Sequence, residues 1–78
     1  MDNFIISYND GLATIHGIEY TPIGYELVDS QSIHMVFQNG EHHTVIYMAA
    51  NSTIINGVTC TTTTQIINLL GNPPELNS

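Results

Sequence analysis

The segment Ser32–Asn51, with the sequence SIHMVFQNGEHHTVIYMAAN, contains the clearest hairpin signal in this chain of 78 residues. Two runs rich in apolar residues, 33–38 and 41–48, lie on either side of Asn39-Gly40. Asn-Gly is strongly favoured in the two-residue type I′ turn, which joins adjacent antiparallel strands. The segment therefore predicts a β-hairpin whose turn is centred on Asn39-Gly40.

Side chains alternate between the two faces of a strand, so this turn also predicts which residues share a face. With this turn, Gln38 pairs with Glu41. His34 then lies opposite Val45. The expected core face carries Ile33, Met35, Phe37, Ile46 and Met48. The other face is amphipathic and carries His34, Val36, Gln38, Glu41, His43, Val45 and Tyr47. We expect this second face to be open or covered by a partner, and its candidate contact residues are His34, Val36, Val45 and Tyr47.

Other short segments of the chain alternate in the same way and end at turn residues. They are Asn3–Tyr8, Leu12–His16, Ile18–Thr21, Tyr25–Asp29, Ser52–Ile55 and Val58–Thr61. Asn9-Asp10-Gly11 and Asn56-Gly57 predict tight turns, and Gly17 predicts a turn or a bulge. Pro22 and Gly24 predict a break between two strands.

The periodicity changes near the C-terminus, where Thr61–Leu70 predicts a short helix. Thr62 and Gln65 have the spacing of a capping box, and Gly71 is a typical C-terminal stop. The apolar stripe of this helix, Ile66, Ile67, Leu69 and Leu70, is expected to complete the core. The predicted fold is α+β: a small antiparallel sheet or sandwich of five to seven short strands with one C-terminal helix. We expect residues 1–71 to form one domain and residues 72–78 to form an extended tail.

The chain has no lysine and no arginine, and its formal net charge is −7. Proteins that bind a nucleic-acid backbone use basic side chains to displace its counterions, so the composition argues against direct binding of DNA or RNA. It argues equally against binding to an anionic membrane surface. The N-terminal sequence MDNFIISYND does not resemble a signal peptide, and no segment has the length and hydrophobicity of a transmembrane helix.

No recognisable constellation of catalytic residues is present, so we expect a protein that is not an enzyme and that uses no cofactor or metal. The single cysteine, Cys60, lies in a predicted strand without a cationic neighbour that would lower its thiol pKa, which favours a buried structural role. His34, Glu41 and His43 share the amphipathic face of the hairpin and form the best candidate for a weak zinc site. Polar residues on a hairpin surface are the simpler interpretation.

The segment IINGVTCTTTTQIINLLGN, residues Ile54–Asn72, resembles a pattern found in small structural proteins of tailed bacteriophages, especially those of Bacteroidetes-type hosts. In these proteins a strand, an Asn-Gly turn and a second strand lead through Ser and Thr residues into a short apolar helix. The resemblance implies a minor virion component, such as a capsid decoration, fibre or assembly protein. It also implies a location in the virion or the host cytoplasm, and a partner that is another copy of the chain or a larger viral assembly.

The acidic composition supports a second hypothesis. An acidic inhibitor, of the DNA-mimic or anti-defence type, would cover a basic surface of a host nucleic-acid-binding protein, and nothing in this chain would repel such a surface. Its candidate contact residues are Glu19, Glu26, Asp29 and Glu41. A structural protein should associate with little dependence on salt, whereas a mimic should lose its partner at about 0.5 M salt.

Overall fold

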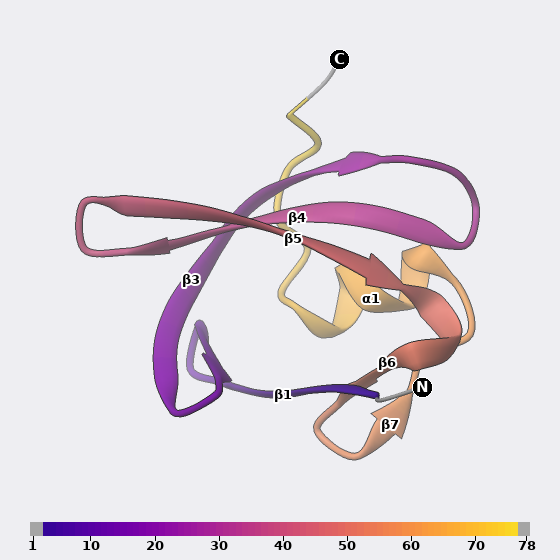
Figure 1. Ribbon diagram of the computed structural model, residues 1–78, viewed down its shortest axis with the longest axis horizontal. Coiled ribbons are helices and arrows are strands. Elements are labelled where there is room, and N and C mark those ends of the chain that lie inside the picture. The colour runs from indigo at the N-terminus through magenta and orange to yellow at the C-terminus, as the bar shows by residue number, and fades with distance from the viewer. Residues whose placement is uncertain (1–2, 77–78) are drawn as a thin grey trace.

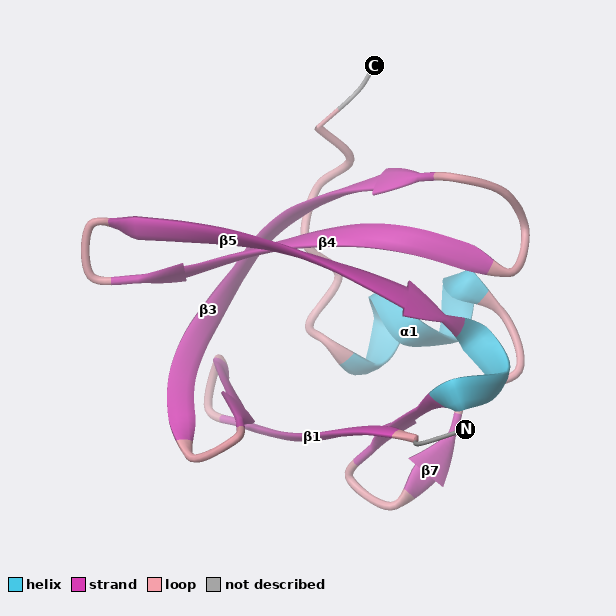
Figure 2. Ribbon diagram, in the orientation of Figure 1, coloured by secondary structure: helices cyan, strands magenta, loops and turns pink. Residues whose placement is uncertain are grey.

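The computed structural model describes residues 3–76 and contains one seven-stranded sheet with the strand order β5-β4-β3-β2-β1-β6-β7. The strands are β1 Phe4–Asn9, β2 Leu12–Ile15, β3 Ile18–Leu27, β4 Ser32–Asn39, β5 His42–Ala49, β6 Thr53–Ile55 and β7 Val58–Thr59. A short 3-10 helix, η1 (Ala50–Ser52), follows β5, and one α-helix, α1 (Thr63–Leu69), follows β7 (Figure 2). The α+β class with a C-terminal helix is confirmed.

Three of the turns have positive φ at both central residues, as a type I′ hairpin requires. They are Asp10-Gly11 (φ 53° and 81°), His16-Gly17 (51° and 81°) and Asn56-Gly57 (52° and 81°). The tight turns expected at Asn9-Asp10-Gly11 and Asn56-Gly57 are therefore confirmed. Gly17 lies in a turn and not in a bulge.

The turn of the β4–β5 hairpin lies one residue later than expected. Asn39 pairs with His42, so the two central residues are Gly40 and Glu41. Of these two only Gly40 has positive φ (60°), which is the conformation of a type II′ turn. The prediction of a type I′ turn on Asn39-Gly40 was wrong, and His34 pairs with Tyr47 in place of Val45. Every partner shifts by two residues, so each side chain keeps its predicted face.

Strand β3 runs without a break through the positions where a break was predicted. Its register with β4 shifts between Pro22 and Gly24, so the prediction of two separate strands was wrong and the irregularity is a β-bulge. A bulge bends a strand and increases its twist. The first part of β3 pairs with β2, while Thr21–Leu27 pairs with β4. Strand β3 thereby joins two arms of a strongly curled sheet (Figure 1).

The sheet is mixed, which corrects the expectation of a purely antiparallel one. β1 and β6 run parallel, with Phe4, Ile5 and Ile6 opposite Thr53, Ile54 and Ile55. A parallel pair requires a crossover connection, and here the whole β2–β5 segment serves as that connection. This pairing brings the first strand next to a segment far along the chain and closes the lower arm of the sheet (Figure 1).

The core fills the inside of the curl, and α1 covers it. The buried apolar residues are Ile6, Ala13, Ile15, Ile33, Met35, Phe37, Met48, Ala50, Ile55, Cys60, Ile66 and Leu70. Of the predicted core residues, Ile46, Ile67 and Leu69 are half-buried and pack against this cluster. The buried face of the β4–β5 hairpin was therefore predicted correctly. The core residues that β1, β2 and β6 contribute were not predicted.

Both ends of α1 are stabilised by local hydrogen bonds. The Thr62 hydroxyl accepts from the Gln65 backbone N–H at 3.3 Å, as the capping prediction expected. The Gln65 side chain accepts from the backbone N–H of Thr61 at 2.9 Å, whereas a capping box would use the backbone N–H of Thr62. At the other end, the N–H of Asn72 donates to Ile67 at 2.9 Å and Gly71 has φ 84°, which is a Schellman motif.

The C-terminal segment is extended and docked on β3. The Tyr25 N–H donates to the Pro74 carbonyl at 3.1 Å, and the Leu76 N–H donates to the Tyr25 carbonyl at 2.8 Å. The Leu76 side chain lies over Gly24, at a place that a Cβ on Gly24 would occupy. Residues 77 and 78 of the predicted tail 72–78 lie outside the described residues. The tail thus covers the part of β3 that β2 does not reach.

Candidate interaction surface

The open edge of β5 presents unpaired backbone groups. Within residues 3–76, β5 pairs only with β4 and ends the sheet on that side. Hydrogen-bonded and non-hydrogen-bonded pairs alternate along a hairpin, starting from a bonded pair next to a two-residue turn. The bonded pairs therefore begin at Asn39 and His42, and the bond from the Ala50 N–H to the Gln31 carbonyl (2.8 Å) continues this alternation. It follows that the N–H and C=O groups of His43, Val45 and Tyr47 point away from β4.

Among residues 3–76, this edge shows none of the features that usually prevent edge strands from pairing with another chain. Natural edge strands are protected by prolines, bulges, lysines or covering segments. All eight residues of β5 pair with β4 in an unbroken register, and the segment contains no proline. The opposite edge strand, β7, is only two residues long. Strand β5 is thus the long, regular edge of this sheet.

The outer face beside this edge is amphipathic, and its apolar side chains form, together with His34, what we call the outer patch: Val36, Val45, His34, Tyr47 and Leu76. Val45 and Tyr47 are 60% and 59% exposed. Val36 pairs with Val45, and His34 pairs with Tyr47, whose rings meet edge to face with centroids 5.7 Å apart. All four contact candidates that the sequence indicated on this hairpin therefore lie together.

Leu76 is the member of the outer patch that the sequence reading missed. It extends the row of Val45 and Val36 across β3, because Gly24 pairs with Val36 and Leu76 lies over Gly24. The available signal was the glycine itself. A glycine inside a strand often marks a site where another segment approaches closely.

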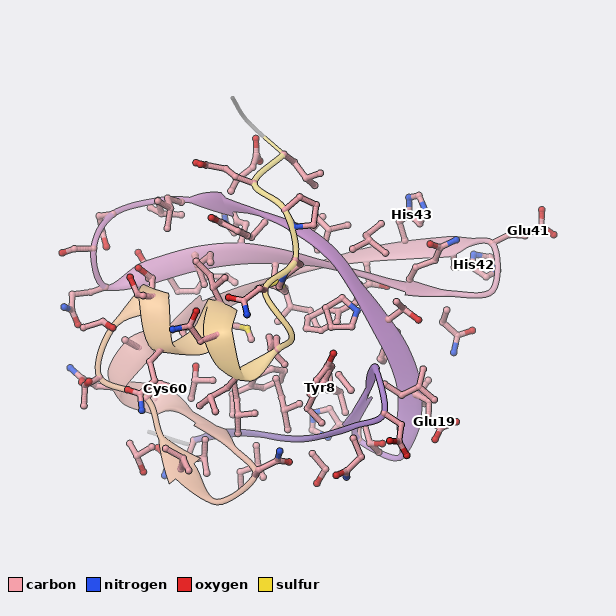
Figure 3. All side chains as sticks on the ribbon, turned by 180° about the vertical axis from the view of Figure 1, so that it is seen from behind. Tyr8, Glu19, Glu41, His42, His43 and Cys60 are labelled. Atoms are coloured by element: carbon pink, nitrogen blue, oxygen red, sulfur yellow. The ribbon has the colours of Figure 1, made fainter. Side chains whose placement is uncertain are left out.

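The four acidic candidates do not form one cluster. Glu19 and Glu26 are seven residues apart on the same strand, about 23 Å along it at the usual rise of about 3.3 Å per residue. Figure 3 shows Glu41 at the tip of the β4–β5 hairpin and Glu19 near the same end of the molecule. Asp29 lies at the other end of β3, in the turn before β4. All four are exposed.

Asp29 organises the β3–β4 turn. Its carboxylate accepts hydrogen bonds from the Gln31 backbone N–H at 2.8 Å and from the Ser32 hydroxyl at 2.9 Å. These bonds, first the one from Gln31, lower the pKa of the Asp29 carboxyl below its ordinary value. The Ser30 carbonyl in the same turn accepts from the Thr63 hydroxyl of α1 at 3.4 Å. A structural role therefore accounts for this acid.

The histidines of the hairpin do not converge on one point. The observed register places His43 opposite Gln38, four residues along β4 from His34, so the two histidines of the candidate zinc site lie apart. His42 and His43 project to opposite sides of β5 (Figure 3). Within residues 3–76, no three histidine, cysteine or acidic side chains are grouped as metal ligands would be.

Cys60 is buried in the core, as its sequence context indicated. Burial raises the pKa of the Cys60 thiol, because the thiolate would lose its hydration. The Cys60 backbone N–H donates to the Thr53 carbonyl at 2.9 Å, which anchors the end of β7 to the start of β6. The thiol is thus a packing group.

A surface hollow of about 480 Å³ lies at β1 and is lined by Asn3, Phe4, Ile5 and His16. The rings of Phe4 and His16 meet edge to face with centroids 6.4 Å apart.

In the described part of the chain, α1 is the longest helix, and no helix has the length and hydrophobicity needed to span a bilayer. Comparison of the chain with family models, with curated proteins and with solved structures found no match to any of them.

Proposed function

We propose that this chain is a non-enzymatic structural or interaction protein that self-associates or docks on a protein partner through the outer patch. The observation that supports this most is the exposure of Val45 and Tyr47 beside an open, unprotected strand edge. Burying such side chains contributes about 25 cal/mol for each Å² of apolar surface. A chain of this size has a small core and gains stability from association.

The biological setting we propose is a virus particle, in which the chain would be a minor component such as a capsid decoration, fibre or assembly protein. This part of the proposal rests on the resemblance of Ile54–Asn72 to small phage structural proteins. The mode of stabilisation is compatible with it, since apolar and backbone contacts do not require the basic side chains that this chain lacks.

Light scattering on a size-exclusion column, at about 0.05 and 0.5 M salt, tests the proposal. We expect a defined oligomer at both salt concentrations, because apolar burial and backbone hydrogen bonds are insensitive to screening. Val45→Ser should weaken it, whereas Ile5→Ser, at a residue that is 65% exposed on β1, should not. A monomer at both salt concentrations would contradict self-association.

That outcome would favour the alternative, an acidic inhibitor of a host nucleic-acid-binding protein. The observation behind this alternative is the exposure of Glu19, Glu26 and Glu41 in a chain without lysine or arginine. A complex of this kind should dissociate at about 0.5 M salt. Replacing Glu19 and Glu41 by Gln should weaken it further, while Val45→Ser should leave it intact.

A further inference from the structure

We propose that β5 pairs edge to edge with β5 of a second copy, antiparallel, about a two-fold axis at Val45. The inference rests on the proposed self-association and names its partner and its register. It starts from the three residues whose backbone groups point away from β4: His43, Val45 and Tyr47. All three are exposed, whereas Ala49, the next residue with this orientation, is half-buried at the start of η1.

The distribution of charge indicates a second copy as the occupant. Each chain has a net charge of −7, but β5 from His42 to Ala49 contains no acid. A basic partner would gain little from such a strip, whereas two acidic chains can meet there without opposing carboxylates. Glu41 lies just outside the strip, at the hairpin tip (Figure 3).

Hydrogen bonding restricts the possible registers. In an antiparallel pair, residues that exchange bonds must both point toward the partner strand. His43, Val45 and Tyr47 form a symmetric set only when Val45 faces Val45 of the second copy. His43 then faces Tyr47 of the other chain, twice, which makes two cross-strand aromatic pairs on the outer face. Each of the three residues exchanges both of its backbone bonds.

The same register keeps the acids apart. Glu41 comes to lie opposite Ala49 of the other chain. The two Glu41 residues are then separated by about 27 Å, at a rise of about 3.4 Å per residue. This distance exceeds the Debye length of about 8 Å at physiological salt. The repulsion between the two Glu41 carboxylates is therefore largely screened, and added salt should change the affinity of the dimer little.

Cysteine cross-linking tests the register. A hydrogen-bonded pair has its Cα atoms about 5.5 Å apart, which matches the separation common in disulfides. Val45→Cys should form disulfide-linked dimers under mild oxidation. A mixture of His43→Cys and Tyr47→Cys chains should form mixed dimers, and neither chain should link to itself. Ile5→Cys, exposed on an interior strand, and the wild-type chain with its buried Cys60 are the controls.

Val45→Pro tests the backbone bonds. Its N–H points away from β4, so proline should be tolerated in the monomer, as it is on natural edge strands. Losing the two bonds at the axis should weaken the dimer about 30-fold, at roughly 1 kcal/mol for each bond. Light scattering measures the dimer, and circular dichroism shows that the monomer is folded.

The outcomes separate this inference from the proposed function. If the chain is oligomeric but Val45→Cys links no more than Ile5→Cys, the edge pairing is overturned and self-association stands. If Tyr47→Cys chains link with Val45→Cys chains in preference, the register centred on Val45 is overturned. If the chain is monomeric and no variant links, both proposals fail.

Discussion

The side-chain amide of Asn56 forms two hydrogen bonds with the backbone of Tyr8. The Tyr8 N–H donates to Asn56 Oδ1 at 2.8 Å, and Asn56 Nδ2 donates to the Tyr8 carbonyl at 2.9 Å. The amide thus takes the place of a peptide group and extends the parallel ladder of β1 and β6 by one residue. Asn56 also has φ 52° in the β6–β7 turn, so one side chain serves both the turn and the sheet.

Replacing Asn56 should separate these two roles. Asn56→Gly keeps the positive φ but loses both bonds, and we expect about 1 kcal/mol of destabilisation. Asn56→Ala also forces a Cβ-bearing side chain without local hydrogen bonds into the left-handed region, which adds about 1 kcal/mol. Urea denaturation measures both. Asp10→Gly, at φ 53° in the β1–β2 turn, is the matched control and should be nearly neutral.

Gly71→Ala should be among the most damaging single-methyl substitutions in the chain. Gly71 has φ 84°, and a Cβ there would overlap the Tyr8 hydroxyl, which Figure 3 shows rising from β1 toward the end of α1. We expect about 2 kcal/mol of destabilisation by thermal unfolding. Adding Tyr8→Phe should recover part of this loss, because it removes the overlapping oxygen. No recovery in the double variant would show that backbone strain alone is responsible.

Asp29→Asn should reduce stability at neutral pH and have little effect in acid. The folded-state pKa of Asp29 is lowered, so its contribution is present above the unfolded pKa of about 3.9 and is lost as pH falls through the folded value. The difference in unfolding free energy between wild type and variant, measured from pH 7 to pH 2, should shrink toward zero. Glu75→Gln, at an exposed acid near the C-terminus, is the control. A constant difference across this range would contradict the assignment.

Cys60 should react with Ellman's reagent only when the protein unfolds, because the thiol is buried and its pKa is raised. The raised folded-state pKa also determines how the free energy of unfolding changes with pH. The contribution is complete below the ordinary thiol pKa of 9.0 and is lost as pH rises through the folded value. The stability of wild type relative to Cys60→Ser should therefore fall as the pH rises above 9.0. Fast labelling of the native protein would overturn the burial.

Local signals in the sequence predicted the elements well, and long-range contacts were the part that they could not supply. Some signals act within a few residues of the chain and could be predicted from the sequence. They are the turn dipeptides Asp10-Gly11 and Asn56-Gly57 and the N-cap Thr62. The alternation in β4 and β5 assigned the outer patch to one face, even though the turn itself lay one residue later. A shift of the pairing by two residues leaves each side chain on the same face of the sheet. The error in the turn therefore did not change the predicted faces.

The parallel pairing of β1 with β6 has no local signature, because Ile5 and Ile54 are compatible with either strand direction. Leu76 was missed for the same reason, since its partner Gly24 lies far away in the sequence. Pro22 and Gly24 were interpreted as a break between two strands, but they flank a β-bulge within one continuous strand. In each case the interaction that determines the structure joins segments far apart in the sequence. The residue pattern of a short stretch therefore cannot predict it.

The β1–β6 pair also determines the order of events during synthesis. Tyr8 and Asn56 are 48 positions apart, so β1 has no neighbour on one side until the chain has been made as far as β6. Such closure is slow, because the entropy of a long loop is lost before the contacts that offset it form. During that interval the N-terminal hairpins present an open apolar edge. A nascent chain that has not yet been made as far as β6 therefore leaves one edge of β1 unpaired.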